Sequence, residues 1–348
     1  MADQKTAIIT GITGQDGSYL AEFLIEKGYK VVGVVRRSSS FNTHRLRNLQ
    51  DNSEEMHAFG YNSSLSLEYG DVTDAGFIGR LVHSVGPDEY YNLGAQSHVR
   101  VSFDSPSYTS EASGNSTLTA LEALKNFAPE CRFYQASSSE MFGATPPPQN
   151  EEARFYPRSP YGIAKLFSYW TTVNYREAYG IRASNGILFN HESPGRGESF
   201  VTKKIATAAA KISLGIQDKI ALGNLNSVRD WGYAPEYVGA MWAMLQAESS
   251  SDYVIATGKA ASVRQFGEMC FALVGLKFDN FVTEDPRLFR PTEVDSLVGD
   301  ASKAKEALGW EPQIDVTKLA DIMVRAELDA IKSGRAFGDK PSYWGLQT

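Results

Sequence analysis

A short glycine-rich segment near the N-terminus constrains the fold of this chain most strongly. Residues 11–17 have the spacing Gly-x-x-Gly-x-x-Gly and follow a β-branched apolar run at Thr6–Thr10. The next residues, Ser18–Lys27, have the pattern of an amphipathic helix that ends at a glycine, and Lys30–Val35 is a second apolar run. A glycine turn between a strand and a helix lets the backbone approach a pyrophosphate at the helix N-terminus. The sequence therefore predicts an α/β fold, a Rossmann-like doubly wound parallel sheet, with a dinucleotide site here.

The end of the second predicted strand indicates which dinucleotide binds. An acidic residue at this place would hold the ribose 2′-hydroxyl of NAD. This chain has Arg36, Arg37 and Ser38 instead. Guanidinium groups match a 2′-phosphate in charge and in bidentate geometry, so we expect NADP as the cofactor. The alternative is a solvated basic turn.

Further apolar runs predict the rest of the sheet. They are Leu65–Val72, Glu89–Gly94, Arg132–Ala136 and Arg182–His191, with a long helix at Thr109–Lys125. The first run ends in Asp71-Val72, a pair suited to hydrogen bonding an adenine amine. The second leads into Ala95-Gln96-Ser97, whose small side chains let the chain pass close to a cofactor. We expect His98, just beyond, to pack or to cap a helix.

The pattern changes after about residue 200. A helix with Lys203 and Lys204, short strands and further helices follow up to about residue 333. At 348 residues the chain exceeds a typical single core. We expect an NADP-binding domain over residues 1–190, to which residues of about 229–260 return. A smaller mixed α/β C-terminal lobe is expected over residues 191–340.

Composition excludes several classes of protein. The net charge of −7 argues against a general affinity for nucleic acid or for an anionic membrane. No apolar stretch approaches the 18 or so residues of a membrane span. The two cysteines, Cys131 and Cys270, lie inside apolar runs, so neither a disulfide framework nor a metal site is expected. These features predict a cytoplasmic enzyme.

Two segments contain residues suited to catalysis. Ser138 and Glu140 follow the predicted strand Arg132–Ala136, where open α/β sheets bind ligands. Tyr161 and Lys165 are four residues apart, hence on one face of a helix. A hydroxyl, a carboxylate, a phenol and an ammonium are therefore expected to meet around one small molecule. The alternative is a polar loop followed by a capped surface helix.

Together these motifs resemble the extended short-chain dehydrogenase/reductase family, in its nucleotide-sugar branch. Within that branch the resemblance narrows to the GDP-mannose 4,6-dehydratases, over about residues 5–335. The segments that carry it are Gly11–Leu20, Arg36–Thr43, Phe155–Tyr161, Asn185–Pro194, Arg229–Gly232 and Phe289–Asp295. Ser137-Ser138-Ser139-Glu140 stands where Ser-Thr-Ser-Glu is usual, which keeps the hydroxyl.

The resemblance implies conversion of GDP-D-mannose to GDP-4-dehydro-6-deoxy-D-mannose and water, a first step towards GDP-fucose, GDP-rhamnose or related 6-deoxysugars. In this mechanism Tyr161 takes the sugar O4 proton while a hydride leaves C4, and Lys165 helps to lower the pKa of the phenol. Ser138 holds the O4 oxygen, and Glu140 removes the C5 proton before water is lost from C6. The hydride then returns to C6, so NADP is recycled internally.

The resemblance also implies the binding residues. Those expected to contact NADP are Gly11, Thr13, Gly14, Gln15, Asp16, Gly17, Arg36, Arg37, Ser38, Asp71, Val72, Leu93, Ala95, Gln96, Ser97, Lys165, His191 and Arg196. Those expected to bind GDP-mannose are Asn190, Val201, Lys204, Arg229, Arg290 and Glu293. Of these, Arg229 and Arg290 would meet the pyrophosphate and Lys204 a guanine oxygen, with surface salt bridges as the alternative. The loop at residues 36–43 resembles one that reaches a neighbouring subunit's cofactor site, which implies a homotetramer.

Three other functions stay open at this point. A dehydratase acting on a GDP-manno-heptose would keep Glu140. A GDP-4-keto-sugar reductase or epimerase would share Tyr161 and Lys165, but the reductases generally lack the carboxylate two residues after the serine. An NADP-binding regulator would be expected to lose Tyr161 or Lys165, and both are present. Glu140 is therefore the residue that discriminates best.

Overall fold

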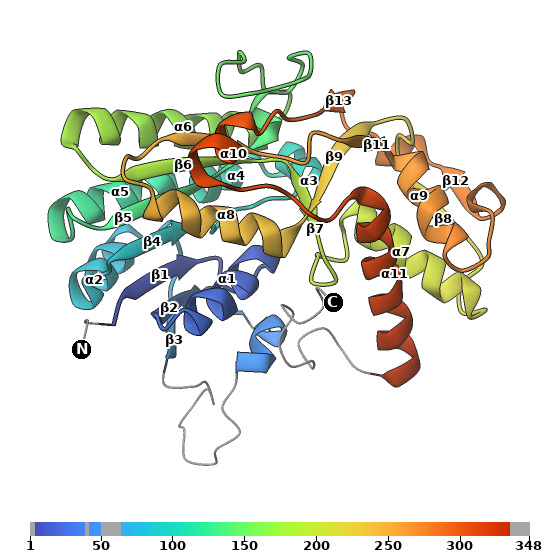
Figure 1. Ribbon diagram of the computed structural model, residues 1–348, viewed down its shortest axis with the longest axis horizontal. Coiled ribbons are helices and arrows are strands. Elements are labelled where there is room, and N and C mark those ends of the chain that lie inside the picture. The colour runs from blue at the N-terminus through green and yellow to red at the C-terminus, as the bar shows by residue number, and fades with distance from the viewer. Residues whose placement is uncertain (1–3, 39–41, 50–63, 335–348) are drawn as a thin grey trace.

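A seven-stranded parallel sheet forms the centre of the molecule. The computed structural model describes residues 4–38, 42–49 and 64–334. Residues 39–41 of the basic loop, and the part of the expected lobe from 335 to 340, lie outside the described residues. The strands run in the order β10-β6-β5-β4-β1-β2-β3 (Figure 1). Their bounds are β1 Thr6–Thr10, β2 Lys30–Val35, β3 Leu65–Tyr69, β4 Glu89–Asn92, β5 Arg132–Ser138, β6 Ala183–Leu188 and β10 Asp252–Ile255.

This strand order confirms the predicted fold class. All neighbouring strands of the sheet are parallel. From β1 the chain builds outward through β2 and β3, and then returns to the other side of β1 to build β4, β5 and β6. The order therefore reverses between β1 and β4. Ligands of open α/β sheets bind at the carboxyl end of such a switch point.

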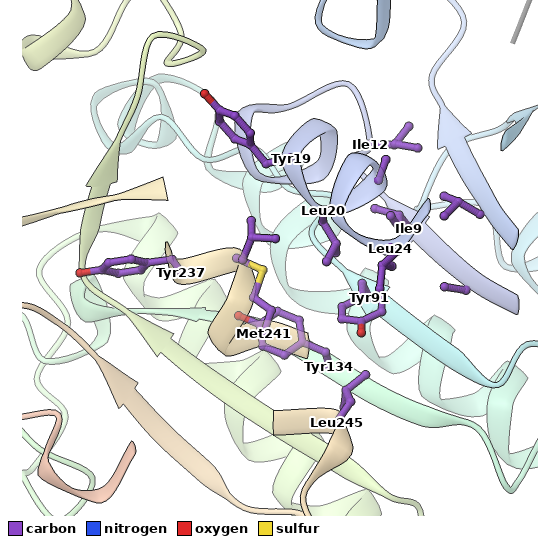
Figure 2. Close-up of a cluster of buried hydrophobic side chains, with 14 of the residues drawn as sticks. Ile9, Ile12, Tyr19, Leu20, Leu24, Tyr91, Tyr134, Tyr237, Met241 and Leu245 are labelled. Carbon is purple, nitrogen blue, oxygen red and sulfur yellow. The ribbon is translucent and has the colours of Figure 1, made fainter. Parts of the chain in front are cut away.

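Helices cover both faces of the sheet. One face carries α1 (Gln15–Glu26), α8 (Ala234–Gln246) and α10 (Ser302–Leu308), and the other α2 (Ala75–Val85), α5 (Ser116–Phe127) and α6 (Pro160–Tyr179). Figure 2 shows the first of these layers: Leu20 and Leu24 of α1 and Met241 and Leu245 of α8 lie over Ile9, Tyr91 and Tyr134 of the strands. Burial on both faces explains why the strands are apolar runs rather than alternating ones.

The C-terminal elements build a second, smaller core. A four-stranded sheet contains β7 (Asn190–Glu192), β9 (Val228–Tyr233), β11 (Ala260–Ser262) and β13 (Ser296–Leu297), and β8 (Ile220–Leu222) pairs with β12 (Val282–Glu284). The helices α7 (Val201–Ser213), α9 (Val263–Ala272) and α11 (Val316–Ser333) pack here, to the right in Figure 1. Trp231, Phe266 and Phe271 are buried at its centre. After β9 the chain returns to the large sheet through α8 and β10.

Some element boundaries differ from the sequence expectation. Helix α1 begins at Gln15 rather than Ser18, because Gly14 itself takes the N-cap position. The strand expected over Arg182–His191 is two strands, β6 and β7. Between them Phe189 N donates to Ile255 O of the large sheet, after which β7 pairs with β9 in the small one. The strand expected over Arg132–Ala136 is longer than predicted, because β5 continues to Ser138, one of the expected catalytic residues.

The helix expected from Thr109 is longer and is interrupted. It consists of α4 (Pro106–Ser110), a π-helical turn at Glu111–Asn115, and α5. The carbonyl of Ser113 in this turn accepts a hydrogen bond from Ser168 Oγ of α6. Because single π turns widen a helix locally, the turn aims that carbonyl at the neighbouring helix. Periodicity gives no signal for such an insertion.

Cys131 and Cys270 are both buried thiols. Within residues 4–38, 42–49 and 64–334, no group of three or more histidine, cysteine or acidic side chains is arranged to hold a metal ion. None of the described helices combines the length and the apolar character needed to cross a membrane.

Candidate active site

The proposed hydroxyl and carboxylate lie at the carboxyl end of β5. Ser138 is the last residue of the strand, and Glu140 lies in the 3₁₀ turn Ser139–Met141 that follows it. The Ser138 Oγ accepts a hydrogen bond of 3.2 Å from the backbone N–H of Glu140. This bond fixes the turn directly after the strand, so both side chains are held at the switch-point edge of the sheet.

The phenol and the ammonium come from the first turns of α6. Ser159 caps this helix by accepting a 3.0 Å hydrogen bond from Gly162 N. A Cβ atom at Gly162 would lie 2.7 Å from the Glu140 carbonyl oxygen, so only glycine permits this close approach of helix and turn. The approach brings Tyr161 close enough to Ser138 for the serine side chain to act on the pKa of the phenol. The four predicted catalytic side chains are therefore brought together, and all four are buried.

Burial shifts the pKa values of Tyr161 and Lys165 in opposite directions. It raises the pKa of Tyr161 to about 12, against the hydrogen bond from Ser138. It also lowers the pKa of Lys165 to about 8. The Lys165 Nζ donates to Ala136 O at 2.7 Å and lies 5.9 Å from the centre of the Tyr161 ring. The expected lowering of the phenol pKa is therefore not produced by the protein alone, because desolvation outweighs the nearby cations.

The Glu140 carboxylate faces an arginine from the C-terminal lobe. Its Oε1 accepts a 3.2 Å charge-assisted hydrogen bond from Arg290 Nη1. Its Oε2 is buried and has no hydrogen-bond partner among the described residues. The Arg290 backbone N–H is held in turn by Glu293 Oε1 at 2.8 Å. One oxygen of the carboxylate is thus available inside the site.

A second arginine faces the same space. Arg229 of β9 is buried, and the hydrogen bond that its guanidinium makes is to the carbonyl of the preceding residue, Val228, at 2.8 Å. Burial lowers its pKa, and the charges of Glu140, Arg290 and Glu293 all act on it. A guanidinium has five N–H donors, and this is the one hydrogen bond that it makes to the described residues. Buried arginine donors of this kind suit a phosphate ligand.

The glycine turn has the form that a pyrophosphate requires. No side chain caps the N-terminus of α1, whose N-cap is Gly14. A Cβ atom on Gly11 would lie 2.9 Å from Gly94 N, and one on Gly17 would lie 2.4 Å from Gly11 O. The turn therefore packs against the β4 end with no room for side chains. An uncapped helix N-terminus beside bare backbone fits the phosphates of a dinucleotide.

A buried charged cluster joins this turn to β7. The His191 Nδ1 lies 2.7 Å from Phe189 O, its Nε2 lies 2.9 Å from Asp16 Oδ2, and its ring stacks on Tyr237. Both partners of the ring are acceptors, so the protonated form of His191 can donate from both nitrogens. Burial alone lowers the pKa of His191, but the Asp16 charge and hydrogen bond outweigh it, and the pKa is raised. For Asp16 burial acts to raise the pKa, and the same pairing with His191 lowers it.

Two further predicted residues take part in the same contacts. Gln15 donates to Asp16 Oδ1 and to His191 O, and accepts from Ser193 Oγ, so its amide is fully used inside the chain. The Arg196 Nε lies 2.9 Å from Glu192 Oε2, and its guanidinium stacks on the ring of Phe200. Gln15 therefore shapes the site rather than offering side-chain atoms to a ligand.

The basic pair at the end of β2 is exposed but held in place. The Arg36 Nη1 donates a 2.6 Å hydrogen bond to Tyr108 Oη of α4, and the Arg37 guanidinium lies 5.8 Å from the centre of the Tyr69 ring. Both arginines lie at the carboxyl end of the sheet, at the edge beyond β1. Their tyrosine partners were not predicted from the sequence.

The remaining predicted residues lie around these groups. Asp71 uses Oδ1 to accept from Thr73 N and Oγ1, and the Gln96 side chain donates to His98 O. His98 caps α3 (Val99–Asp104), as expected for a packing or capping residue. Thr13, Val72, Leu93, Ala95 and Ser97 line the loops beyond β1, β3 and β4, and Asn190, Val201 and Lys204 lie on β7 and α7.

Arg45 is a site residue that sequence reasoning missed. Its Nε donates to Gly195 O at 2.8 Å and its Nη1 to Thr13 O at 3.1 Å. It therefore clamps the glycine turn to the loop after β7. The only signal in the sequence was its place just after the basic segment of residues 36–43. Sequence spacing does not show that Arg45 contacts Thr13 and Gly195.

The His191–Asp16 pair predicts a pH-dependent stability. The raised pKa of His191 means that its contribution is complete below about pH 6.5 and is lost as pH rises through the raised value. The lowered pKa of Asp16 means that its contribution is present above about pH 4 and is lost as pH falls. His191→Gln should therefore destabilise the protein most between these limits. The side chain of Asp16 is 24% exposed, so we expect a loss of roughly 2 kcal/mol, less than for a fully buried pair.

Urea unfolding of the unmodified protein and of His191→Gln, at pH 5.5 and at pH 9, measures this loss of stability. The difference in unfolding free energy should shrink at pH 9. His83→Gln, which changes an exposed histidine on α2, is the matched control and should show no such trend. A His191→Gln difference that stays constant across this range would contradict the assignment.

Comparison with known proteins agrees with this geometry. Residues 8–323 match the family model described as GDP-mannose 4,6 dehydratase. The chain is 51% identical to GDP-mannose 4,6 dehydratase 1 of Arabidopsis thaliana over 97% of its length and 93% of that protein. It is 49% identical to the GDP-mannose 4,6 dehydratase of Homo sapiens over 95% of this chain and 93% of that protein.

Solved structures show the same fold at low identity. RMD from Pseudomonas aeruginosa, complexed with NADPH, superposes with a TM-score of 0.75 at 20% identity, covering 94% of this chain and 99% of that one. The dTDP-glucose 4,6-dehydratase of Bacillus anthracis, in complex with NAD, gives a TM-score of 0.78 at 18% identity, covering 92% and 96%. The resemblance inferred from the motifs is confirmed by the sequence relatives: this chain belongs to the GDP-mannose 4,6-dehydratase family and is an enzyme of the hydro-lyase class.

Proposed function

We propose that this chain converts GDP-D-mannose to GDP-4-dehydro-6-deoxy-D-mannose and water, using the four clustered side chains as its catalytic residues. The observation that carries this assignment is the position of Glu140. Its carboxylate lies in the turn directly after Ser138, within the same buried cluster as Tyr161, and one of its oxygens has no partner among the described residues. A simple carbonyl reductase needs the hydroxyl and the phenol, but it does not need this carboxylate.

The chemistry requires one cofactor and four proton transfers. A nicotinamide cofactor held at the glycine turn of residues 11–17 would supply the exchange of a hydride between C4 and C6 of the sugar. Tyr161 takes the O4 proton, and the Ser138 hydroxyl holds the same oxygen. Once C4 is a ketone the C5 proton is acidic, and Glu140 removes it as general base. The same carboxyl then protonates the departing C6 hydroxyl, so that one water leaves. As the hydride reaches C6, C5 takes up a proton, which balances the proton that Tyr161 took from O4, and the reaction is redox-neutral overall.

The opposite effects of burial on Tyr161 and Lys165 support this division of work. A phenol with a pKa near 12 stays protonated at neutral pH, so it does not act as a base until an additional positive charge approaches. Lys165, with a pKa near 8, is still largely an ammonium at neutral pH and is held close by Ala136 O. The site is therefore arranged to activate the phenol only in a complex.

We assign the nucleotide of the substrate to the second lobe. Arg229 and Arg290 would bind the pyrophosphate, since Arg290 bonds to Glu140 and the buried Arg229 interacts electrostatically with both of these residues. Lys204, an exposed residue in the first turn of α7, would meet a guanine oxygen, and Asn190, Val201 and Glu293 would complete the site. Residues 1–190 with α8 and β10 would hold the dinucleotide. The remaining part of residues 191–340 would hold the GDP-sugar.

The proposed cofactor is NADP. Arg36 and Arg37 are exposed at the strand end where the adenosine ribose lies in such folds, and each is oriented by a tyrosine. An acidic partner for a 2′-hydroxyl is not present at these positions. The charged cluster of Asp16 and His191 and the uncapped α1 N-terminus would then lie close to the cofactor phosphates.

The proposed assembly is a homotetramer built as a dimer of dimers. Helix α6 exposes Ile163, Phe167 and Trp170, which recur at i, i+4 and i+7 and so form one apolar stripe. An apolar stripe of this size on a surface helix marks an interface. We expect Trp170→Glu to reduce the molar mass in solution, measured by light scattering after size exclusion. An unchanged mass would exclude α6 from the interface.

Removing the basic pair should change the cofactor preference. Arg36→Ala should weaken NADP binding about tenfold or more and leave NAD binding nearly unchanged, because only NADP carries the 2′-phosphate. Titration calorimetry with each dinucleotide measures this ratio. Arg100→Ala, which removes an exposed arginine paired with Asp104 on α3, is the matched control. Equal weakening of NAD and NADP would contradict the NADP assignment.

The activity is tested by incubating the protein with GDP-mannose, NADP and no reductant. A 4-keto-6-deoxy sugar should form over many turnovers without net appearance or loss of NADPH. Consumption of NADPH in proportion to product would show a reductase instead. Parallel incubation with a GDP-manno-heptose measures which sugar is preferred.

The role of Glu140 is tested in the same assay. Glu140→Gln should lower turnover by roughly 100-fold or more and should abolish exchange of the C5 hydrogen with D₂O, while GDP-mannose still binds. Glu152→Gln, an exposed glutamate in the loop before α6, is the control and should keep full activity. Persistent C5 exchange in Glu140→Gln would remove Glu140 as the base.

A further inference from the structure

We propose that Arg290 has a second role as a positioning residue: it holds Glu140 in the ligand-free protein and leaves it for the pyrophosphate when substrate binds. This inference rests on the proposed function and deepens it, because it links recognition of the nucleotide to release of the base. The observations that carry it are the Arg290–Glu140 ion pair and the surroundings of its two members.

Glu140 needs a partner in the ligand-free state. The carboxylate lies 8% exposed among buried groups, with Oε2 unpaired and Oε1 bonded to Arg290. A buried carboxylate without a counter-charge is strongly unfavourable, so the ion pair keeps this side chain ordered and charged. In this ion pair Glu140 Oε1 is bonded to Arg290, so it is not available to accept a proton from the substrate.

Arg290 is placed to change partners. It lies in the loop between a 3₁₀ turn at Pro286–Leu288 and β13, and its side chain is more exposed than that of Glu140, at 27%. The loop is anchored at Arg290 and just after it: Glu293 Oε1 accepts from the backbone N–H of Arg290, and Thr292 Oγ1 donates to Arg158 O. The hydrogen bond to Glu140 is the one its side chain makes to any described residue. Swinging the side chain therefore breaks a single contact and leaves the loop in place.

The position of Arg229 indicates where the Arg290 side chain would move when the pyrophosphate binds. Its guanidinium is buried in β9, acts on both Glu140 and Arg290, and has no carboxylate bonded to it among the described residues. Two guanidinium groups near each other repel unless an anion lies between them. Glu140 supplies one negative charge and a pyrophosphate supplies two, so the nucleotide competes for Arg290 with an advantage. Once Arg290 is taken, the positive charge of Arg229 still acts on Glu140, and both oxygens of the carboxylate are free to face the sugar.

The proposal predicts that Glu140 and GDP compete for one arginine. With NADP present, Glu140→Gln should bind GDP about 3- to 10-fold more tightly than the unmodified protein, because the neutral amide holds Arg290 less strongly. Arg290→Gln should weaken GDP binding. In the Arg290→Gln background, the further change Glu140→Gln should alter GDP affinity by less than about twofold. Titration calorimetry of the four proteins gives this double-mutant cycle.

The outcomes separate the possible causes. Equal tightening by Glu140→Gln with and without Arg290 would mean direct repulsion between the carboxylate and GDP, and would overturn the proposal. An unchanged affinity of Glu140→Gln would overturn it as well, while leaving the proposed activity intact. Failure of the unmodified protein to bind GDP at all would instead overturn the assignment of the substrate site, and this proposal with it.

Two further variants complete the design. Arg287→Gln removes an exposed arginine three residues away that pairs with Asp285, and it should leave GDP binding unchanged in both backgrounds. Arg290→Lys keeps the charge and should restore part of the coupling that Arg290→Gln abolishes. If Glu140→Gln does not fold, as judged by its thermal unfolding, Glu140→Ala gives the same comparison.

Discussion

The close approach of helix α6 to the end of strand β5 is the constraint on which the site depends. Gly162 lies against the backbone of Glu140, at a distance that any side chain would increase. This contact brings the phenol of Tyr161 onto the Ser138 hydroxyl and places Lys165 under the Ala136 carbonyl. Without it the serine, glutamate, tyrosine and lysine would be four polar residues on separate elements. The parallel sheet supplies the platform, because its strand order reverses beside this edge.

Burial of charge is the second principle of the molecule. Desolvation moves the pKa values of Tyr161 and Lys165 away from those of an active base and a simple ammonium. Where charges are buried in pairs, as for His191 with Asp16, they stiffen the connection between the glycine turn and β7. Where the pairing is incomplete, as for Arg229 and one oxygen of Glu140, polar atoms are left without a partner among the described residues. These positions are the ones to which we assign the substrate and the chemistry.

Much of this architecture was predictable from local sequence patterns. The strand at Thr6–Thr10, the glycine turn and the apolar runs gave the fold class, because a buried parallel strand has a distinctive composition. The place of Ser138 and Glu140 after a strand, and of Tyr161 and Lys165 on one helix face, made them candidates, and the family resemblance supplied their expected roles. The contacts of Arg290 with Glu140 and of Arg45 with Thr13 were not predictable, since they join residues 150 and 32 positions apart. The division of Arg182–His191 between two sheets likewise depends on packing partners that periodicity does not show.

The central claim of the proposed function is that the hydride which leaves C4 returns to C6 of the same sugar. Ser138, Glu140, Tyr161 and Lys165, which are buried together, are the residues to which we assign this chemistry. The most direct measurement is to supply GDP-mannose carrying deuterium at C4 and to locate the label in the product. The account predicts that the deuterium is found at C6 of the same sugar molecule. Deuterium found in solvent or in released cofactor would contradict it.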